Sequence, residues 1–299
     1  RRVREGGKPG FPKFKSRRHA RQSYRTNGGK IVDRNHIALP KLGNVRAKVS
    51  RPLQGRFISV TVSLDAAGCY FATFLCTDVP AKDMPATDRE VGIDLGVETL
   101  ATFSDGTKIG NPRHLKKYER KLAREQRRLS RRKGARRGEK QSMRYLKQRK
   151  RVARVHAKIP DARTDALHKV TTMLADENQV LCMENLNAKG MVRNHHLAKA
   201  VSDASFGEFA RLLEYKCAER GRTLVKVGRF YPSSKTCSAC GHRLDALPLS
   251  VRSWDCPACG AHHDRDVNAA RNILTEGKRI LSNTQGTAGH AGTVAAITA

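Results

Sequence analysis

The chain has 299 residues, enough for one substantial hydrophobic core and a smaller attached module. Lysine and arginine outnumber aspartate and glutamate by 59 to 27, for a net charge of +32, and so large a positive charge disfavours a compact fold unless a polyanion neutralises it. No apolar run approaches the roughly 20 residues of a membrane span, and no secretory leader opens the chain. We therefore expect a soluble, intracellular protein that binds nucleic acid and has no membrane partner; an anionic membrane surface is the alternative.

The first 30 residues indicate a nucleic-acid-binding arm. Residues 1–30 contain eleven Lys or Arg and one acid, with Phe11, Phe14 and Tyr24 among them. Basic groups contact phosphates and aromatic rings stack on bases, so this composition predicts an extended arm, with a disordered tail as the alternative. The expected contacts include Lys13, Lys15, Arg17 and Arg18. Because the chain starts at Arg1 without a methionine, we also expect a natural N-terminal part to precede it.

Residues 31–85 predict a small antiparallel β module. Apolar residues alternate with polar ones from Ile58 to Leu64, a turn follows at residues 65–68, and a second strand-like run comes next. Residues 80–87 then form a linker. Beyond it, residues 90–110 indicate three short strands, the last two joined by a hairpin turn at Asp105-Gly106.

A strongly basic region follows these strands. Between Lys116 and Arg154, 19 of 39 residues are Lys or Arg and three are acidic, and glycines near residue 136 interrupt the helical pattern. This pattern predicts two long basic helices joined by a turn. A solvated helix face is the usual meaning of a charge run, but the scarcity of acids favours nucleic-acid binding. The expected contacts are Arg127, Arg128, Arg131 and Arg132.

The rest of the chain alternates helices and strands. A helix over residues 161–174 precedes a strand that ends at Glu184, then a helix with Phe206, Phe209, Leu213 and Cys217 toward the core, and a strand at 223–227. A final helix begins near Asp266, and residues 282–299 are expected to form a disordered tail. This order predicts an α/β fold.

The eight cysteines form two groups. The first four are isolated in apolar surroundings and are expected to be small core residues: Cys69, Cys76, Cys182 and Cys217. The others form C-x2-C-x15-C-x2-C within residues 236–260, the spacing of a zinc ribbon: Cys237, Cys240, Cys256 and Cys259. Two disulfides are the alternative. Four thiolates already close a zinc site, so we expect His242, His262 and His263 to be surface or nucleic-acid contacts.

Three carboxylates occupy comparable places in this order. Asp94 and Glu184 end strands, and Asp266 opens the last helix. In an α/β sheet, functional groups gather at the carboxyl ends of strands. Each acid also has a purely structural interpretation, and Asp264 competes with Asp266 as the helix cap. Acids that converge within so basic a chain would favour a divalent cation.

Several segments in their order resemble the TnpB (OrfB) proteins of bacterial transposons, which are relatives of the type V CRISPR effectors. These segments are GIDLGVETLATFSDG, LAREQRRLSRRKGARRG, RTDALHKVTTML, MENLNAKGMVRN, YPSSKTCSACG and HDRDVNAARNIL. The resemblance implies an RNase H-like (RuvC) nuclease domain in two parts, residues 86–235 and 261–281, with the zinc ribbon inserted between them. It also implies that the preceding β module is an oligonucleotide-binding domain.

The same resemblance implies an RNA-guided DNA endonuclease whose catalytic acids correspond to Asp94, Glu184 and Asp266. Its implied cofactors are two Mg²⁺ or Mn²⁺ ions and one structural zinc per chain. Its implied partners are a guide RNA from the transposon end and target DNA, in the cytoplasm and nucleoid of a bacterium or archaeon. Two alternatives remain open: a nucleic-acid-binding protein without nuclease activity, and a strand-transfer transposase that uses the same acids.

Overall fold

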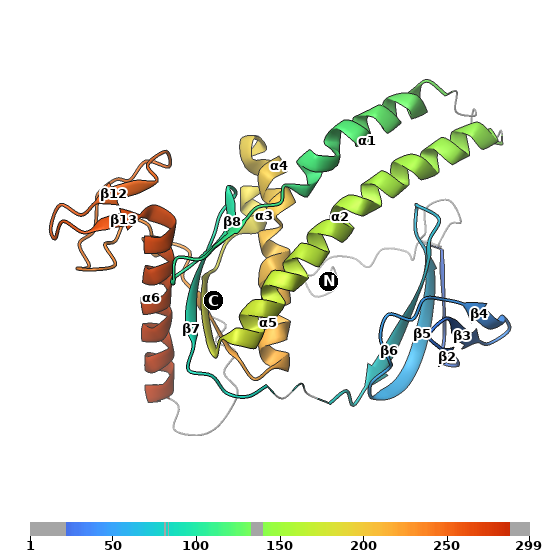
Figure 1. Ribbon diagram of the computed structural model, residues 1–299, viewed down its shortest axis with the longest axis horizontal. Helices are drawn as coiled ribbons and strands as arrows, with labels where there is room; N and C mark the ends of the chain where they lie inside the picture. Colours follow the sequence, from blue (N-terminus) through green and yellow to red (C-terminus); the bar gives the residue numbers. More distant parts are fainter. Residues whose placement is uncertain (1–21, 81, 83, 133–139, 288–299) are drawn as a thin grey trace, which may run out of the picture. The chain divides into compact units, whose positions relative to one another are not determined.

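The protein is described by a computed structural model (Figure 1) that covers residues 22–80, 82, 84–132 and 140–287. The chain divides into two compact units, Arg1–Pro80 with Glu125–Arg154 and Ala81–Arg124 with Val155–Ala299. The predicted arm contacts Lys13, Lys15, Arg17 and Arg18 lie outside the described residues. Within the described part of the chain, no helix has the length and apolar character needed to cross a membrane.

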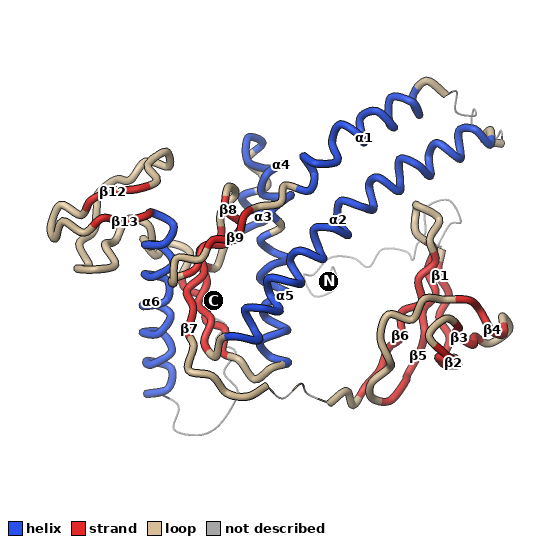
Figure 2. Tube along the Cα trace, viewed as in Figure 1, coloured by secondary structure: helices blue, strands red, loops and turns tan. Residues whose placement is uncertain are grey.

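The β module contains two three-stranded antiparallel sheets, with orders β1-β5-β6 and β2-β3-β4 (Figure 2). The strands are β1 Ser23–Thr26, β2 Lys30–Asp33, β3 His36–Leu39, β4 Gly43–Arg46, β5 Arg56–Leu64 and β6 Tyr70–Thr77. They enclose a small core at Ile37, Leu39 and Val60. An open hollow of about 1430 Å³ is lined by residues of this module alone.

The predicted boundary of the arm is wrong in this region. Residues 23–26 are not part of an extended arm, because β1 pairs with β5, with Tyr24 opposite Val62. The Arg25 Nε also donates a hydrogen bond to Ser59 Oγ at 3.0 Å. The backbone N–H and C=O groups on the side of β5 away from β6 are paired by β1. A basic composition does not prevent such pairing.

The basic region forms α1 His114–Ser130 and α2 Met143–Glu177, which confirms the two predicted helices. The helix predicted separately at 161–174 is instead the continuation of α2, with Pro160 inside it. A proline inside a helix costs a hydrogen bond, but one apolar seam continues across it and keeps the helix packed. Its buried members are Val152, Val155, Ile159, Leu167 and Leu174.

The second unit is built on a five-stranded mixed sheet in the order β11-β10-β7-β8-β9. Its strands are β7 Glu90–Leu95, β8 Thr99–Phe103, β9 Lys108–Gly110, β10 Val180–Glu184 and β11 Thr223–Val227, and all five were predicted. The pairs β7–β8 and β8–β9 are antiparallel, whereas β10 runs parallel to both β7 and β11.

Helices cover both faces of this sheet (Figure 1). Alternate strand residues such as Ile93 and Met183 pack with the C-terminal half of α2 and with α5 Phe206–Glu219, near the short α3 Ala188–Met191 and α4 His195–Ala204. The intervening positions, including Cys182 and Val227, pack against α6 Arg265–Thr287. Successive side chains along each strand therefore point to opposite faces of the sheet, as the geometry of a β-strand requires.

Two predictions about single segments are wrong. Cys182 and Cys217 are buried as expected, but Cys69 is exposed and Cys76 is partly exposed, because the small β module leaves much of its surface in water.

The predicted tail begins too early, since α6 continues to Thr287. Ile280 and Leu281 hold this last part of α6 by packing near Ile273.

Candidate metal-binding and catalytic site

Strand pairing places Asp94 and Glu184 side by side. In the parallel ladder, Met183 of β10 pairs with Ile93 of β7, so Glu184 and Asp94 occupy the next level. Neighbouring strands lie about 4.8 Å apart, and residues at the same level of a parallel pair point to the same face. Glu184 is the last residue of β10. Both carboxylates therefore lie at the carboxyl edge of the sheet, as the sequence predicts.

A glycine on β7 brings α6 onto the same edge. A Cβ atom added to Gly92 would lie 2.0 Å from the Ala270 carbonyl oxygen, so the helix backbone touches the strand directly. The helix runs in the direction opposite to the strand, since Ala270 lies against Gly92 and Lys278 pairs with Glu90. The strand covers about 6.6 Å from Gly92 to Asp94, and the helix covers about 6 Å in the same direction from Ala270 to Asp266. Asp266 is consequently level with Asp94, on the face of the sheet that α6 covers.

The electrostatics of Asp94 agree with this convergence. Burial, followed by the negative charges of Glu184 and Asp266, raises the pKa of Asp94 to about 7, against an opposing effect from Arg265. Burial also raises the pKa of Glu184, although the hydroxyl of Ser233 opposes this by donating a hydrogen bond to Glu184 Oε1 at 2.5 Å. The fold therefore gathers negative charge that a bound cation would stabilise.

Asp264 has a different role from Asp266. Its Oδ1 accepts hydrogen bonds from the backbone N–H groups of Asp266 and Val267, at 3.1 and 3.0 Å, so Asp264 caps α6. Its Oδ2 pairs with Lys108 Nζ of β9 at 2.7 Å. Asp264 is therefore the residue that caps the helix. Asp266, in the first turn, has an oxygen atom 3.8 Å from an Arg252 guanidinium nitrogen, and its negative charge contributes to the raised pKa of Asp94.

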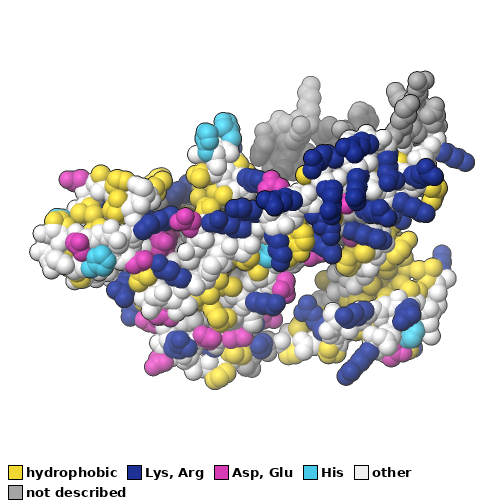
Figure 3. All heavy atoms as spheres, turned by 45° about the horizontal axis from the view of Figure 1, so that its top comes forward, with side chains coloured by type: hydrophobic (Ala, Val, Ile, Leu, Met, Phe, Trp, Pro, Cys, Tyr) yellow, Lys and Arg dark blue, Asp and Glu magenta, His cyan; other side chains and the backbone are white. Residues whose placement is uncertain are grey.

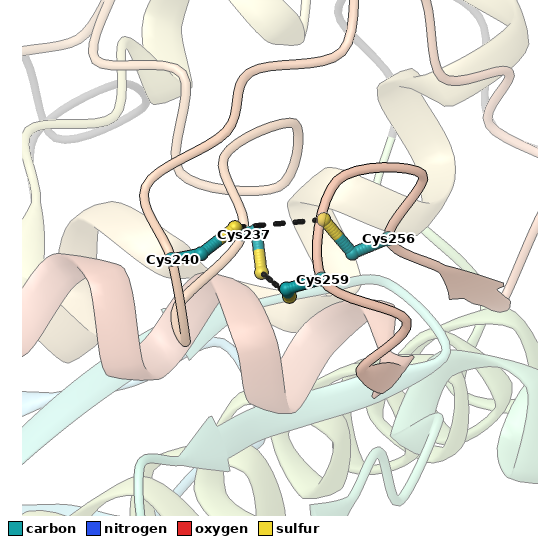
Figure 4. A group of neighbouring side chains, drawn as sticks. All are labelled: Cys237, Cys240, Cys256 and Cys259. Atoms are coloured by element: carbon teal, nitrogen blue, oxygen red, sulfur yellow. Dashed lines mark hydrogen bonds between the residues drawn. The ribbon is translucent and has the colours of Figure 1, made fainter.

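The four motif cysteines lie in the segment between β11 and α6 and converge on one point (Figure 4). Cys237 and Cys240 come first in this segment, and Cys256 and Cys259 lie in the turn of its hairpin. Their sulfur atoms all lie within 4.8 Å of one another, and the pairs Cys237–Cys259 and Cys240–Cys256 are 3.7 and 3.6 Å apart. Disulfide sulfurs would be about 2 Å apart, whereas sulfurs around a tetrahedral zinc, each about 2.3 Å from it, are about 3.8 Å apart. The cluster therefore fits a zinc ion, and the disulfide alternative does not fit.

One histidine near the cysteines is not the surface contact that the sequence predicts. His263 is buried on the hairpin of β12 Ser253–Asp255 and β13 His262–Asp264, and its ring packs on Trp254 with centroids 4.8 Å apart. Its Nε2 lies 3.0 Å from the Cys237 sulfur. A ring N–H in this place can hydrogen-bond to the thiolate and orient it. His262 is exposed and pairs with Asp255.

The basic side chains gather over α1 and α2 (Figure 3). Arg127 and Arg131 are exposed, and Arg128 is exposed but pairs with Glu125 at 3.1 Å. Arg132 is partly buried and donates to the Arg144 carbonyl oxygen at 2.7 Å. Of the four predicted contacts, Arg127 and Arg131 are thus the most available to a phosphate backbone.

The two candidate metal sites differ in their donor atoms. Four cysteine sulfurs suit zinc. Among the described residues, these cysteines are the group of three or more possible ligands whose ligand atoms lie close enough to hold one metal ion. The three carboxylates supply hard oxygen atoms, which suit Mg²⁺ or Mn²⁺, and the negative charge gathered around Asp94 fits a divalent cation. The oxygen atoms of the three carboxylates do not form such a close group in the described part of the chain.

Comparison with protein families gives two matches. Residues 74–195 match the OrfB family of IS605 elements, described as "Probable transposase". Residues 206–273 match the family described as "Cas12f1-like, TNB domain". Together these matches include Asp94, Glu184, Asp266 and the four motif cysteines.

Curated relatives match most of the chain. A protein of Streptomyces pristinaespiralis named "Putative RNA-guided DNA endonuclease" is 45% identical over 271 residues, covering 89% of this chain and 65% of its own length. The "Putative RNA-guided DNA endonuclease InsQ" of Escherichia coli is 33% identical over 289 residues, covering 91% of this chain and 70% of its own length. The chain thus spans about two thirds of the length of these relatives.

A solved structure shares the fold. The Cas12f1 chain in a cryo-EM structure of the Cas12f1–sgRNA–target DNA complex superposes with a TM-score of 0.50 and 22% identity, covering 73% of this chain and 45% of that chain. At this identity the likeness concerns the fold.

Proposed function

Because the chain belongs to the TnpB (OrfB) family, we propose that it is the nuclease part of an RNA-guided DNA endonuclease, with Asp94, Glu184 and Asp266 as its catalytic acids. The observation that supports this proposal most is the strand pairing that puts Glu184 beside Asp94 at the carboxyl edge of the sheet. Burial, with the nearby charges of Glu184 and Asp266, raises the pKa of Asp94 to about 7. The names of the relatives support the guide RNA and the DNA target.

The mixed sheet with α6 on one face supports an RNase H-like (RuvC) domain, and the cysteine cluster supports an inserted zinc ribbon. The β module would be the oligonucleotide-binding domain that the resemblance implies.

The proposed chemistry is phosphodiester hydrolysis. Two Mg²⁺ or Mn²⁺ ions, when bound, would activate a water and stabilise the leaving oxygen. Asp94, Glu184 and Asp266 would hold them, each as the deprotonated carboxylate. Arg127 and Arg131 would contact the nucleic-acid backbone, while guide pairing would supply sequence selection.

The test begins with RNA that co-purifies with the full-length protein. This RNA is sequenced, and duplex DNA that carries its complement is incubated with the complex and Mg²⁺. We expect cleavage by the wild-type complex and none by Asp94→Ala, with similar DNA binding by both. Cleavage by Asp94→Ala at the wild-type rate would overturn the proposal.

A second candidate, strand transfer, is favoured by the description of the matching family as a transposase. It would use the same acids but join a donor 3′ end to the target. Gel analysis of the same reactions separates the two, because joined products are longer than either substrate.

A further inference from the structure

The loop that follows β11 contacts the candidate catalytic site through one serine. Ser233 is 6% exposed, and its hydroxyl donates to Glu184 Oε1 at 2.5 Å. It lies six residues beyond Val227, the strand neighbour of Glu184. A single hydrogen bond of this kind fixes the orientation of a carboxylate only if the loop that carries the donor is itself held in place.

Two asparagines of α6 hold this loop. Asn272 Nδ2 donates to the backbone carbonyl oxygens of Ser233 and Thr236, at 2.7 and 2.6 Å. Asn268 Nδ2 donates to the Thr236 carbonyl at 2.7 Å. Asn268 and Asn272 are 1% and 4% exposed, and they lie one helical turn apart on the same side of α6. Buried amides of this kind are costly unless they are paired, so their partners define the position of the loop.

Asn268 also reaches the cysteine cluster. Its Oδ1 accepts a hydrogen bond from the Ser238 backbone N–H at 2.9 Å. One side chain therefore grips Thr236 and Ser238, the residues on either side of Cys237. Asn268 lies two residues beyond Asp266 on the same helix. One continuous set of hydrogen bonds thus joins Glu184, through Ser233 and the two asparagines, to the first cysteine knuckle, which is the turn that carries Cys237 and Cys240. The asparagines belong to the same helix as Asp266.

We propose that Ser233 is a positioning residue for Glu184, and that Asn268 and Asn272 couple its placement to the metal held by the four cysteines. This inference rests on the proposed function, because it concerns how Glu184 binds a divalent ion. Without a metal, the cysteine ligands no longer hold the first knuckle to the second, which is the turn that carries Cys256 and Cys259, and the contact between Cys237 and His263 remains. The loop that carries Ser233 is then held by the asparagines of α6 but no longer by a metal-bound Cys237. As a result, Ser233 fixes the orientation of Glu184 less firmly, and divalent ions bind more weakly at the carboxylates.

The chemistry of the amide makes the coupling testable. Asparagine supplies a donor to Thr236 and an acceptor to Ser238, whereas aspartate of the same shape keeps the acceptor and loses the donors. Asn268→Asp therefore breaks one half of the connection with little change in volume. Ser233→Thr keeps the hydroxyl that Ser233→Ala removes.

The main measurement is Mn²⁺ binding to the protein without nucleic acid, by electron paramagnetic resonance, with zinc content and circular dichroism recorded for each variant. Loss of a residue that orients a metal ligand typically weakens binding by about 10- to 100-fold. We expect weakening of about tenfold in Ser233→Ala and Asn268→Asp, and binding close to wild type in Ser233→Thr. Thr275→Ala, an exposed hydroxyl on the same helix, is the matched control and should change nothing.

The coupling itself is measured with Cys259→Ser, which removes one exposed ligand of the cysteine cluster. We expect it to weaken Mn²⁺ binding in a protein with Asn268, and to weaken it less in the Asn268→Asp background, because the connection is already broken. Equal weakening in the two backgrounds would overturn the coupling. Wild-type Mn²⁺ affinity in folded Ser233→Ala, or equal losses in Ser233→Ala and Ser233→Thr, would overturn the role of Ser233.

The Asp94→Ala variant separates this inference from the proposed function. If Asp94→Ala still cleaves DNA, the proposed function fails whatever Ser233 does. If Asp94→Ala is inactive while Ser233→Ala and Asn268→Asp bind Mn²⁺ like wild type, the nuclease assignment stands and the positioning role is wrong.

Discussion

Replacing Asp94 by asparagine should make the protein more stable in the absence of Mg²⁺. Burial and the neighbouring carboxylates raise the pKa of Asp94 from 3.8 to about 7. The folded chain therefore holds this proton more tightly than the unfolded chain does. Ionised Asp94 lowers stability increasingly as pH rises from about 4 to about 7, and the full loss is present above pH 7. An asparagine at this position carries no charge and avoids this loss.

The magnitude follows from the two pKa values. A change from 3.8 to about 7 corresponds to roughly 4 kcal/mol as an upper bound. Asp94 is only partly buried by surface area, so water screens its charge and reduces the effect. We expect Asp94→Asn to stabilise the protein by about 1 to 3 kcal/mol at pH 8, which for a domain of this size is a rise in Tm of roughly 3 to 10 °C.

The assay is thermal unfolding of wild type and Asp94→Asn, loaded with zinc and without Mg²⁺, at pH 8 and pH 5. The stability difference should shrink at pH 5, and added Mg²⁺ should stabilise only the wild type. Asp88→Asn, at an exposed position six residues earlier, is the control and should change stability by less than about 0.5 kcal/mol. Equal stability of Asp94→Asn and wild type at pH 8, or a larger difference at pH 5, would refute the reasoning.

Three further predictions concern the other parts of the molecule. Elemental analysis of purified protein should find about one zinc per chain, and Cys256→Ser should release it; zinc-free wild-type protein would contradict the cluster. Replacing Arg127 and Arg131 together by alanine should reduce the slope of log affinity against log salt by up to about 2, and adding Arg128→Ala and Arg132→Ala should change it less, since these two already have partners. Asp264→Ala should cost about 1 to 2 kcal/mol of stability through loss of the helix cap but leave substantial DNA cleavage, whereas Asp266→Ala should abolish cleavage; the opposite pattern would exchange their roles.

Local sequence patterns predicted the elements of the second unit well. Its strands alternate or are continuously apolar, and they end at turn residues such as Gly106, whose φ of +95° suits glycine. The edge position of Asp94 and Glu184 follows from where their strands end. The spacing of four cysteines likewise predicted a cluster that the fold forms.

Contacts between distant segments could not be predicted in the same way. The first strand is short and basic, and only its pairing with β5 identifies it. His263 looked like one of several surface histidines, yet the alternation along β13 turns it inward while His262 faces water. Ser233, Asn268 and Asn272 have ordinary surface-residue chemistry, and their roles depend on α6 lying against the loop after β11.

Gly92 shows most clearly what separates the two kinds of information. The sequence places a glycine two residues before Asp94, which by itself indicates no more than a position without a side chain. In the fold, that missing Cβ is what lets the Ala270 carbonyl approach the strand. Any larger residue would push α6 outward and carry Asp266, one turn from Ala270, away from Asp94. The distance between two of the three acids is therefore set by a residue that carries no chemical group of its own.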